Sequence, residues 1–123
     1  MFLMALVLCS APVGVESYAA CDYGVTIIQP APCPFFGILN IEARAVSDAG
    51  HVVGWRPNCS LSDDIAYLWT PQGGMVDIPF PVGTNGRRAQ DTNSSGIVVG
   101  SANFPNDGLG RLAFVYNSGT GQL

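Results

Sequence analysis

Hydrophobic residues in this chain fall into short runs separated by Gly, Pro, Asn and Asp. The runs at 51–55, 65–70, 75–80, 97–102 and 112–116 are rich in β-branched and aromatic residues. Such runs predict strands, and no window places apolar residues at helical spacing behind a capped start. The segment 31–37, APCPFFG, is too rich in proline for a central strand and predicts a connecting loop. We therefore expect an all-β fold.

The chain contains two similar units. Residues 43–54 and 89–100 share five of twelve positions, AYLW at 66–69 corresponds to AFVY at 113–116, and GMV at 74–76 corresponds to GQL at 121–123. The separation is 46 residues at first and 47 after one extra loop residue. A period of this length with several strands per unit is typical of propeller blades. The sequence thus predicts about two blades without closure of the ring, with this division: signal peptide 1–20, N-terminal strand and Pro-rich loop 21–42, first unit 43–88, truncated second unit 89–123.

Two pairs of glycines recur at the same place in both units. Gly50 and Gly96 end the turn sequences SDAG and NSSG, where a positive φ is expected. Gly54 and Gly100 lie inside predicted strands, where glycine is typical of a bulge or of the close approach of another backbone. The repeated apolar positions should form the core, and we predict burial of Val52, Val53, Tyr67, Leu68, Trp69, Val98, Val99, Phe114 and Val115. The paired aromatic residues among them are interpreted as core rather than as a sugar-stacking platform.

The pattern A-x-x-x-N-x-x-G-x-V-V-G, followed by an Ala-aromatic-x-aromatic strand, resembles the HAF-repeat family of extracellular proteins. The second unit fits better, with Asn93 and with Ala113-Phe114, whereas the first has Ser47 at the Asn position. The family is named for a His-Ala-Phe tripeptide, and both units lack its His, since Ile65 and Leu112 occupy that place. The resemblance covers about 43–123, with Tyr23–Pro30 as a leftover strand of a preceding unit. It implies an exported protein of propeller-like β-repeats and no established activity.

The first fifteen residues, MFLMALVLCSAPVGV, form an apolar run of signal-peptide length, followed by small residues near Ala19 and Ala20. Pro12 and Gly14 disfavour a buried helix, and the run is short for a membrane anchor. We expect export, extracellular or periplasmic. Cleavage before Cys21 would instead make a lipoprotein with Cys21 lipidated, the only route by which this sequence predicts membrane attachment.

Cys9 would leave with the signal peptide, so the mature chain would keep three cysteines. No C-x-x-C pair supports a zinc site. We predict a disulfide between Cys33 and Cys59, with Cys21 left odd or lipidated. The rival pair, Cys21 with Cys33, closes a shorter loop and would stabilise less.

Composition argues against nucleic acid as a partner. Charged residues are only 11% of the chain and the net charge is −4, whereas binding to nucleic acid needs clustered cations. Only Arg87 and Arg88 are adjacent, and this pair is interpreted as a solvated turn. Asp63 and Asp64 are also adjacent and are interpreted as a solvated loop, since neighbours on a strand would point to opposite faces.

The sequence offers no catalytic, cofactor-binding or metal-binding residues. His51 is the single histidine and occupies an ordinary strand position, so that a multi-histidine metal site is excluded. No nucleophile elbow, zinc-protease or phosphate-loop motif occurs. We therefore expect a non-catalytic binding or interaction module for an unknown ligand or protein. The alternative is a fragment of a propeller-type hydrolase or lyase whose site needs further blades. Two blades would leave sheet edges open, which favours self-association.

Overall fold

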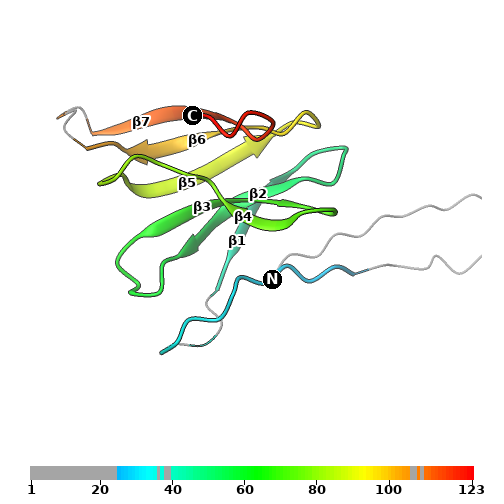
Figure 1. Ribbon diagram of the computed structural model, residues 1–123, viewed down its shortest axis with the longest axis horizontal. Helices are drawn as coiled ribbons and strands as arrows, with labels where there is room; N and C mark the ends of the chain where they lie inside the picture. The colour runs from blue at the N-terminus through cyan, green and yellow to red at the C-terminus, as the bar shows by residue number, and fades with distance from the viewer. Residues whose placement is uncertain (1–24, 36, 38–39, 106–107, 109) are drawn as a thin grey trace, which may run out of the picture.

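The protein folds into two antiparallel sheets with no helix in the part of the chain that the structure describes (Figure 1), which confirms the all-β expectation. The structure is a computed structural model and describes residues 25–35, 37, 40–105, 108 and 110–123. The proposed signal peptide 1–20 and both Cys9 and Cys21 lie outside these residues. The strands are β1 (Glu42–Val46), β2 (Val52–Pro57), β3 (Asp64–Thr70), β4 (Gly74–Asp77), β5 (Asn85–Thr92), β6 (Ile97–Asn103) and β7 (Arg111–Asn117).

Each sheet is a simple meander in which neighbours in sequence are neighbours in space. The first sheet has the order β1-β2-β3-β4 and the second the order β5-β6-β7. Figure 1 shows the second sheet, yellow to red, above the first, with the blue N-terminal segment below it. The sequence analysis missed β1 and β5, since both carry polar residues at alternating or consecutive positions and neither resembles an apolar run.

The pairing registers of the two sheets correspond residue by residue. Ala43 pairs with Gly54 just before an irregularity in β1, and Ala89 pairs with Gly100 just before an irregularity in β5. A Cβ at Gly54 would overlap the carbonyl oxygen of Glu42, and one at Gly100 would overlap that of Arg88. The expected bulge and close approach are both present. They lie within each sheet, so the glycines serve strand pairing rather than contact between units.

The turns that precede β2 and β6 also correspond. Gly50 and Gly96 have φ of 78° and 76°, as the turn sequences predicted. The Gly50 amide donates to the Ser47 carbonyl at 2.9 Å, and the Gly96 amide donates to the Asn93 carbonyl at 3.1 Å. The Asn93 side chain adds two further bonds, because Asn93 Oδ1 accepts the backbone amides of Ser95 and Ile97. Ser47, at the corresponding position, reproduces these bonds only in part.

Residues 25–32 form no strand, so the N-terminal strand expected within 21–42 is absent from its described part. This segment instead lies on the first sheet through Ile28, which packs against Val52 and Tyr67. The described residues of the expected loop, 31–35 and 37, form no strand, and a single pair of backbone bonds joins Cys33 and Gly37. The predicted strand 75–80 is shorter in the structure, because β4 ends at Asp77 and only the Ile78 amide continues, donating to the Ala66 carbonyl.

Candidate interaction surface

The apolar contact between the two sheets is made by one face of each. Val53, Ala66 and Leu68 of the first sheet pack in one cluster with residues of the second, among them Val98 and Phe114. Phe80, from the connection between the sheets, meets the Phe114 ring edge-on at 4.9 Å between centroids. A closely packed apolar contact of this kind is where most of the stabilisation of a small β protein arises. We call this contact the seam.

Two charged pairs border the seam and connect the sheets. Arg87 Nη2 lies 2.8 Å from Asp63 Oδ2, and Arg88 donates through Nε to Asp64 Oδ2 at 2.6 Å. Asp63 Oδ1 also accepts the Gly86 amide at 2.6 Å, and Arg87 Nε donates to the Asp64 carbonyl. Bonds to charged groups are the stronger kind. These four residues therefore determine how the first sheet is placed on β5.

The interpretation of these doublets as solvated is wrong, and so is the turn expected at Arg87 and Arg88, although Asp63 does lie in the loop before β3. The side chains of Arg87 and Asp63 are only 20% and 16% exposed. Arg87 and Arg88 belong to strand β5, and Asp64 begins β3. The signal in the sequence was one of charge type alone: an acidic doublet and a basic doublet occur in the same short chain, and opposite charges can pair.

Trp55 lies beside these charges. The guanidinium carbon of Arg88 is 5.0 Å from the centroid of the Trp55 ring, and that of Arg44 is 5.3 Å away. Both distances are within the range of cation–π attraction. Arg88 is thus held by a carboxylate and by an aromatic ring of the first sheet, so that Trp55 belongs to the seam.

A cleft of about 500 Å³ opens at the end of the seam, lined by Pro57, Leu61, Ser62, Asp63, Asp64, Asn85, Gly86, Arg88 and Arg111. Its two carboxylates each accept bonds from an arginine, so they do not stand as a free acid–base pair across a substrate. Arg111 donates to Ser101 Oγ at 2.9 Å, and no carboxylate pairs with it among the described residues. The cleft is mainly the open end of the contact between the sheets.

The remaining residues that could carry chemistry do not form clusters in the described part of the chain. His51 lies directly before β2, and its Nδ1 is buried with no hydrogen-bond partner among the described residues. Over the same residues no three His, Cys, Asp or Glu side chains gather as metal ligands would. The described segments also contain no helix of a length and hydropathy that could cross a bilayer.

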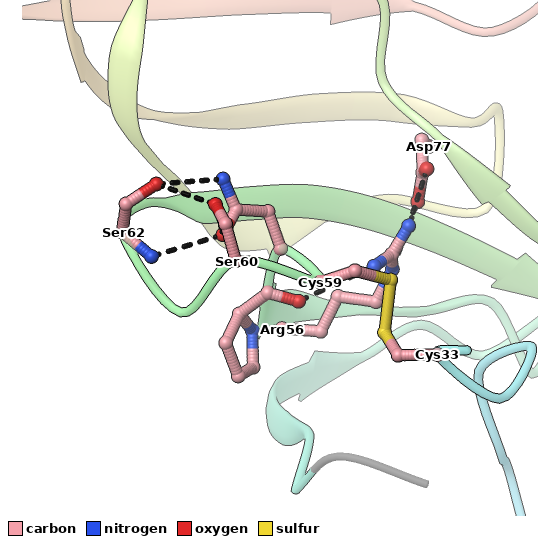
Figure 2. The surroundings of a disulfide bond; sticks show 8 residues. Cys33, Arg56, Cys59, Ser60, Ser62 and Asp77 are labelled. Carbon is pink, nitrogen blue, oxygen red and sulfur yellow. Dashed lines mark hydrogen bonds and ion pairs between the residues drawn. A yellow bond between two sulfur atoms is a disulfide. The ribbon is translucent and has the colours of Figure 1, made fainter. Parts of the chain in front are cut away.

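The predicted disulfide is present. Cys33 and Cys59 are joined with their Cα atoms 5.4 Å apart, which confirms the pairing inferred from the sequence. Figure 2 shows that the bond ties the N-terminal loop to the loop after β2, beside the Arg56–Asp77 ion pair. Arg56 donates to both carboxylate oxygens of Asp77, at 3.2 and 2.7 Å. The disulfide therefore ties the N-terminal loop to the first sheet at Cys33, five residues after Ile28, while Ile28 itself is held by packing.

The other face of the second sheet is left uncovered by the described residues. Val99 and Val115 are 40% and 57% exposed, so their predicted burial is wrong, and Trp69 is only partly buried. The prediction was right for Val52, Val53, Tyr67, Leu68, Val98 and Phe114. The failure has a plain cause, since burial of both faces of a sheet requires a layer on each side. Within the described part of the chain, the first sheet has the second sheet on one side and residues 25–35 on the other, and the second sheet has one neighbour.

The exposed face carries the same positions that the first sheet uses at the seam. Val53 corresponds to Val99, Ala66 to Ala113 and Leu68 to Val115, at separations of 46 and 47 residues. The pairings agree, because Val53 is opposite Leu68 and Val99 is opposite Val115. Val53 and Leu68 are 0% and 6% exposed. An apolar sheet face built like a buried one and left open is typical of an interaction surface. We call Val99, Ala113 and Val115 the outer face.

Compared with models of known families, with curated proteins and with solved structures, the chain matches none.

Proposed function

We propose that this protein is an exported, non-catalytic interaction module of propeller-like blades that binds a protein partner through its outer face. The observation that carries the proposal is the correspondence of Val99, Ala113 and Val115 with the seam residues Val53, Ala66 and Leu68. The resemblance to HAF repeats supports the blade interpretation. Each meander would be one blade, and the seam would be the contact between consecutive blades.

The rim of the outer face fits a protein partner. Polar or charged side chains occur around its apolar centre, among them Arg111 of β7 and Asn103 and Ser101 of β6. An apolar centre with a polar rim is the usual composition of a protein–protein interface. The enzymatic alternative has less support, because the acidic residues of the cleft are engaged by Arg87 and Arg88.

Export is supported by the N-terminal run and by the disulfide. A structural disulfide is typical of an oxidising compartment, and Cys33–Cys59 is such a bond. The mature chain is expected to begin near Ala20 or Cys21. Intact mass of the protein from the periplasm or medium tests this: a mass that retains Met1 contradicts it, and a diacylglycerol adduct on Cys21 indicates the lipoprotein form.

Carbene footprinting with mass-spectrometric detection tests the interaction surface even while the partner is unidentified. The exported protein is labelled in its native medium and again after purification and strong dilution. We expect labelling of Val99 and of Ala113–Val115 to rise on dilution, while Val82, 98% exposed in a connecting loop, labels equally in both samples. Equal labelling of the outer face in both samples would refute the proposal, and turnover of an ester or glycoside substrate would favour the enzymatic alternative.

A further inference from the structure

We propose that the partner of the outer face is a second copy of this chain, docked head to tail with its first sheet against that face. This inference rests on the proposed function and adds the identity of the partner. It is drawn from the charged positions of the seam, whose signs are inverted at the corresponding positions of the other sheet. The seam itself supplies the geometry.

The seam pairs a residue at the start of the third strand of one sheet with a residue of the first strand of the next. In the chain these are Asp64 and Arg88. The corresponding residue in the second sheet is Arg111, which pairs with Asn103 as Asp64 pairs with Pro57. The position of Arg88, opposite Ser101, is held in the first sheet by Glu42, opposite Trp55.

Both charges are therefore reversed at the corresponding positions. A second sheet that docks on the first sheet of another copy brings Arg111 to Glu42, opposite charges again. A second sheet docked on a second sheet would bring Arg111 to Arg88. A first sheet docked on a first sheet would bring Asp64 to Glu42, and both of these place like charges together. Complementary charges with repulsion of the wrong partners are a known source of specificity.

The charges are available for such a contact. The Glu42 side chain is half exposed, and among the residues that the structure describes its one ion pair is a long one, 3.5 Å, with Arg44. Arg111 borders the outer face, because it lies two residues before Ala113 on β7 and therefore on the same side of the sheet. Its bond to Ser101 Oγ holds it there, at the mouth of the cleft that ends the seam. The apolar centres also agree. In the seam, Val53 and its neighbours pack in one cluster with Val98, and the outer face carries the residues that correspond to Val53 and its neighbours. The residue of the first sheet that corresponds to Val98 is Val52, which lies on the receiving face.

The receiving face is covered at present by residues 25–30, through Ile28. The Cys33–Cys59 disulfide anchors this cover only at its far end, five residues after Ile28, so residues 25–30 can leave the sheet while the anchor stays in place. Among the described residues no backbone hydrogen bond joins residues 25–30 to the sheet, and two side chains of this segment, Val25 and Ile27, are each 56% exposed. Docking of a second copy displaces this segment. Because the contact is heterologous, repeated docking closes a ring or extends a filament.

Sedimentation velocity on the mature full chain, over a wide concentration range, tests the inference. We expect concentration-dependent association that Val115→Asp abolishes and that Val82→Asp, a change of an exposed loop valine, leaves intact. Arg111→Glu and Glu42→Arg are each expected to weaken association by roughly tenfold or more, and the double variant is expected to recover most of it. Arg111→Gln separates loss of charge from its reversal and should be the milder change. Circular dichroism and melting temperature establish that each variant is folded.

The outcomes separate the two proposals. A purified chain that stays monomeric at every concentration overturns the inference, and the proposed function stands if footprinting still shows protection in the exported sample. Association that depends on Val115 but does not respond to the charge exchange also overturns head-to-tail docking. Association that is unaffected by Val115→Asp overturns the inference as well, because the contact then lies elsewhere on the chain, and footprinting again decides the proposed function.

Discussion

The hydroxyl of Tyr67 donates a hydrogen bond to the carbonyl oxygen of Glu42 at 3.1 Å. The same oxygen lies where a Cβ on Gly54 would be. At the bulge of β1 the Glu42 carbonyl thus contacts two residues: Tyr67 donates a hydrogen bond to it, and Gly54 has no Cβ that would overlap it. In the second sheet Phe114 takes the position of Tyr67 and makes no such bond, while Gly100 keeps its role beside Arg88. The first sheet therefore depends on a buried polar contact that the second lacks.

Replacement of Tyr67 by Phe is expected to lower the free energy of unfolding by about 1 kcal/mol, the usual value for one hydrogen bond. The Phe ring can fill the same space, as Phe114 does at the corresponding position. Urea denaturation of the variant and the parent measures the difference. Tyr116→Phe is the matched control, since Tyr116 is a buried tyrosine on the corresponding strand. A loss as large in the control would show that the Glu42 contact is not the cause.

Burial of the Tyr67 phenol, and to a lesser degree the charge of Glu42, raises its pKa from 10.0 to about 12. The folded state therefore holds the proton more tightly than the unfolded state. Stability from this group is fully present below pH 10 and is lost as the pH rises toward 12. We expect the midpoint of unfolding to fall over this window, and to fall less steeply in Tyr67→Phe. Identical alkaline slopes would contradict the assignment.

Substitution of Gly54 or Gly100 by Ala is expected to cost about 1–3 kcal/mol, because the new Cβ forces the bulged backbone to move. In both cases the obstacle is a backbone carbonyl, which yields less easily than a side chain. Gly119→Ala is the control, as its Cβ would meet only the Asn117 side chain, at 3.2 Å. Thermal melting compares the three. Equal small effects would mean that the strands can shift apart without cost.

Removal of the disulfide by Cys33→Ser with Cys59→Ser is expected to lower stability by roughly 3 kcal/mol, as estimated from closure of the intervening loop. Melting with and without a reductant provides the measurement. The parent should lose stability in the reductant and the double variant should not respond to it. A parent that melts alike in both conditions would show that the loop is held by other contacts.

Asp63→Ala is expected to cost about 1–3 kcal/mol, because it leaves the half-buried Arg87 and the Gly86 amide without their acceptor. The control is Asp48→Ala at an exposed turn position, which should change stability little. A double-mutant cycle between Asp63 and Arg87 gives the coupling directly. A coupling near zero would place the stabilisation of the seam in its apolar part alone.

The local pattern of the sequence determined the class of fold, the turns at Gly50 and Gly96, and the bulges at Gly54 and Gly100. Each of these depends on residues that are near in sequence or directly paired, so the residue type carries the information. The Cys33–Cys59 bond was also predictable, since few cysteines leave few pairings.

Only the tertiary structure decided which faces are covered and which charges meet. Val53 and Val99 occupy corresponding positions in similar segments, yet one is buried and the other exposed, because burial depends on the layer beside the strand and not on the strand. Asp63 and Arg87 each resemble a solvated residue when considered alone, and they become a half-buried pair through the stacking of two sheets. Burial and ion pairing at such positions depend on segments that are distant in sequence, and the local pattern of residues does not specify which segment will pack there.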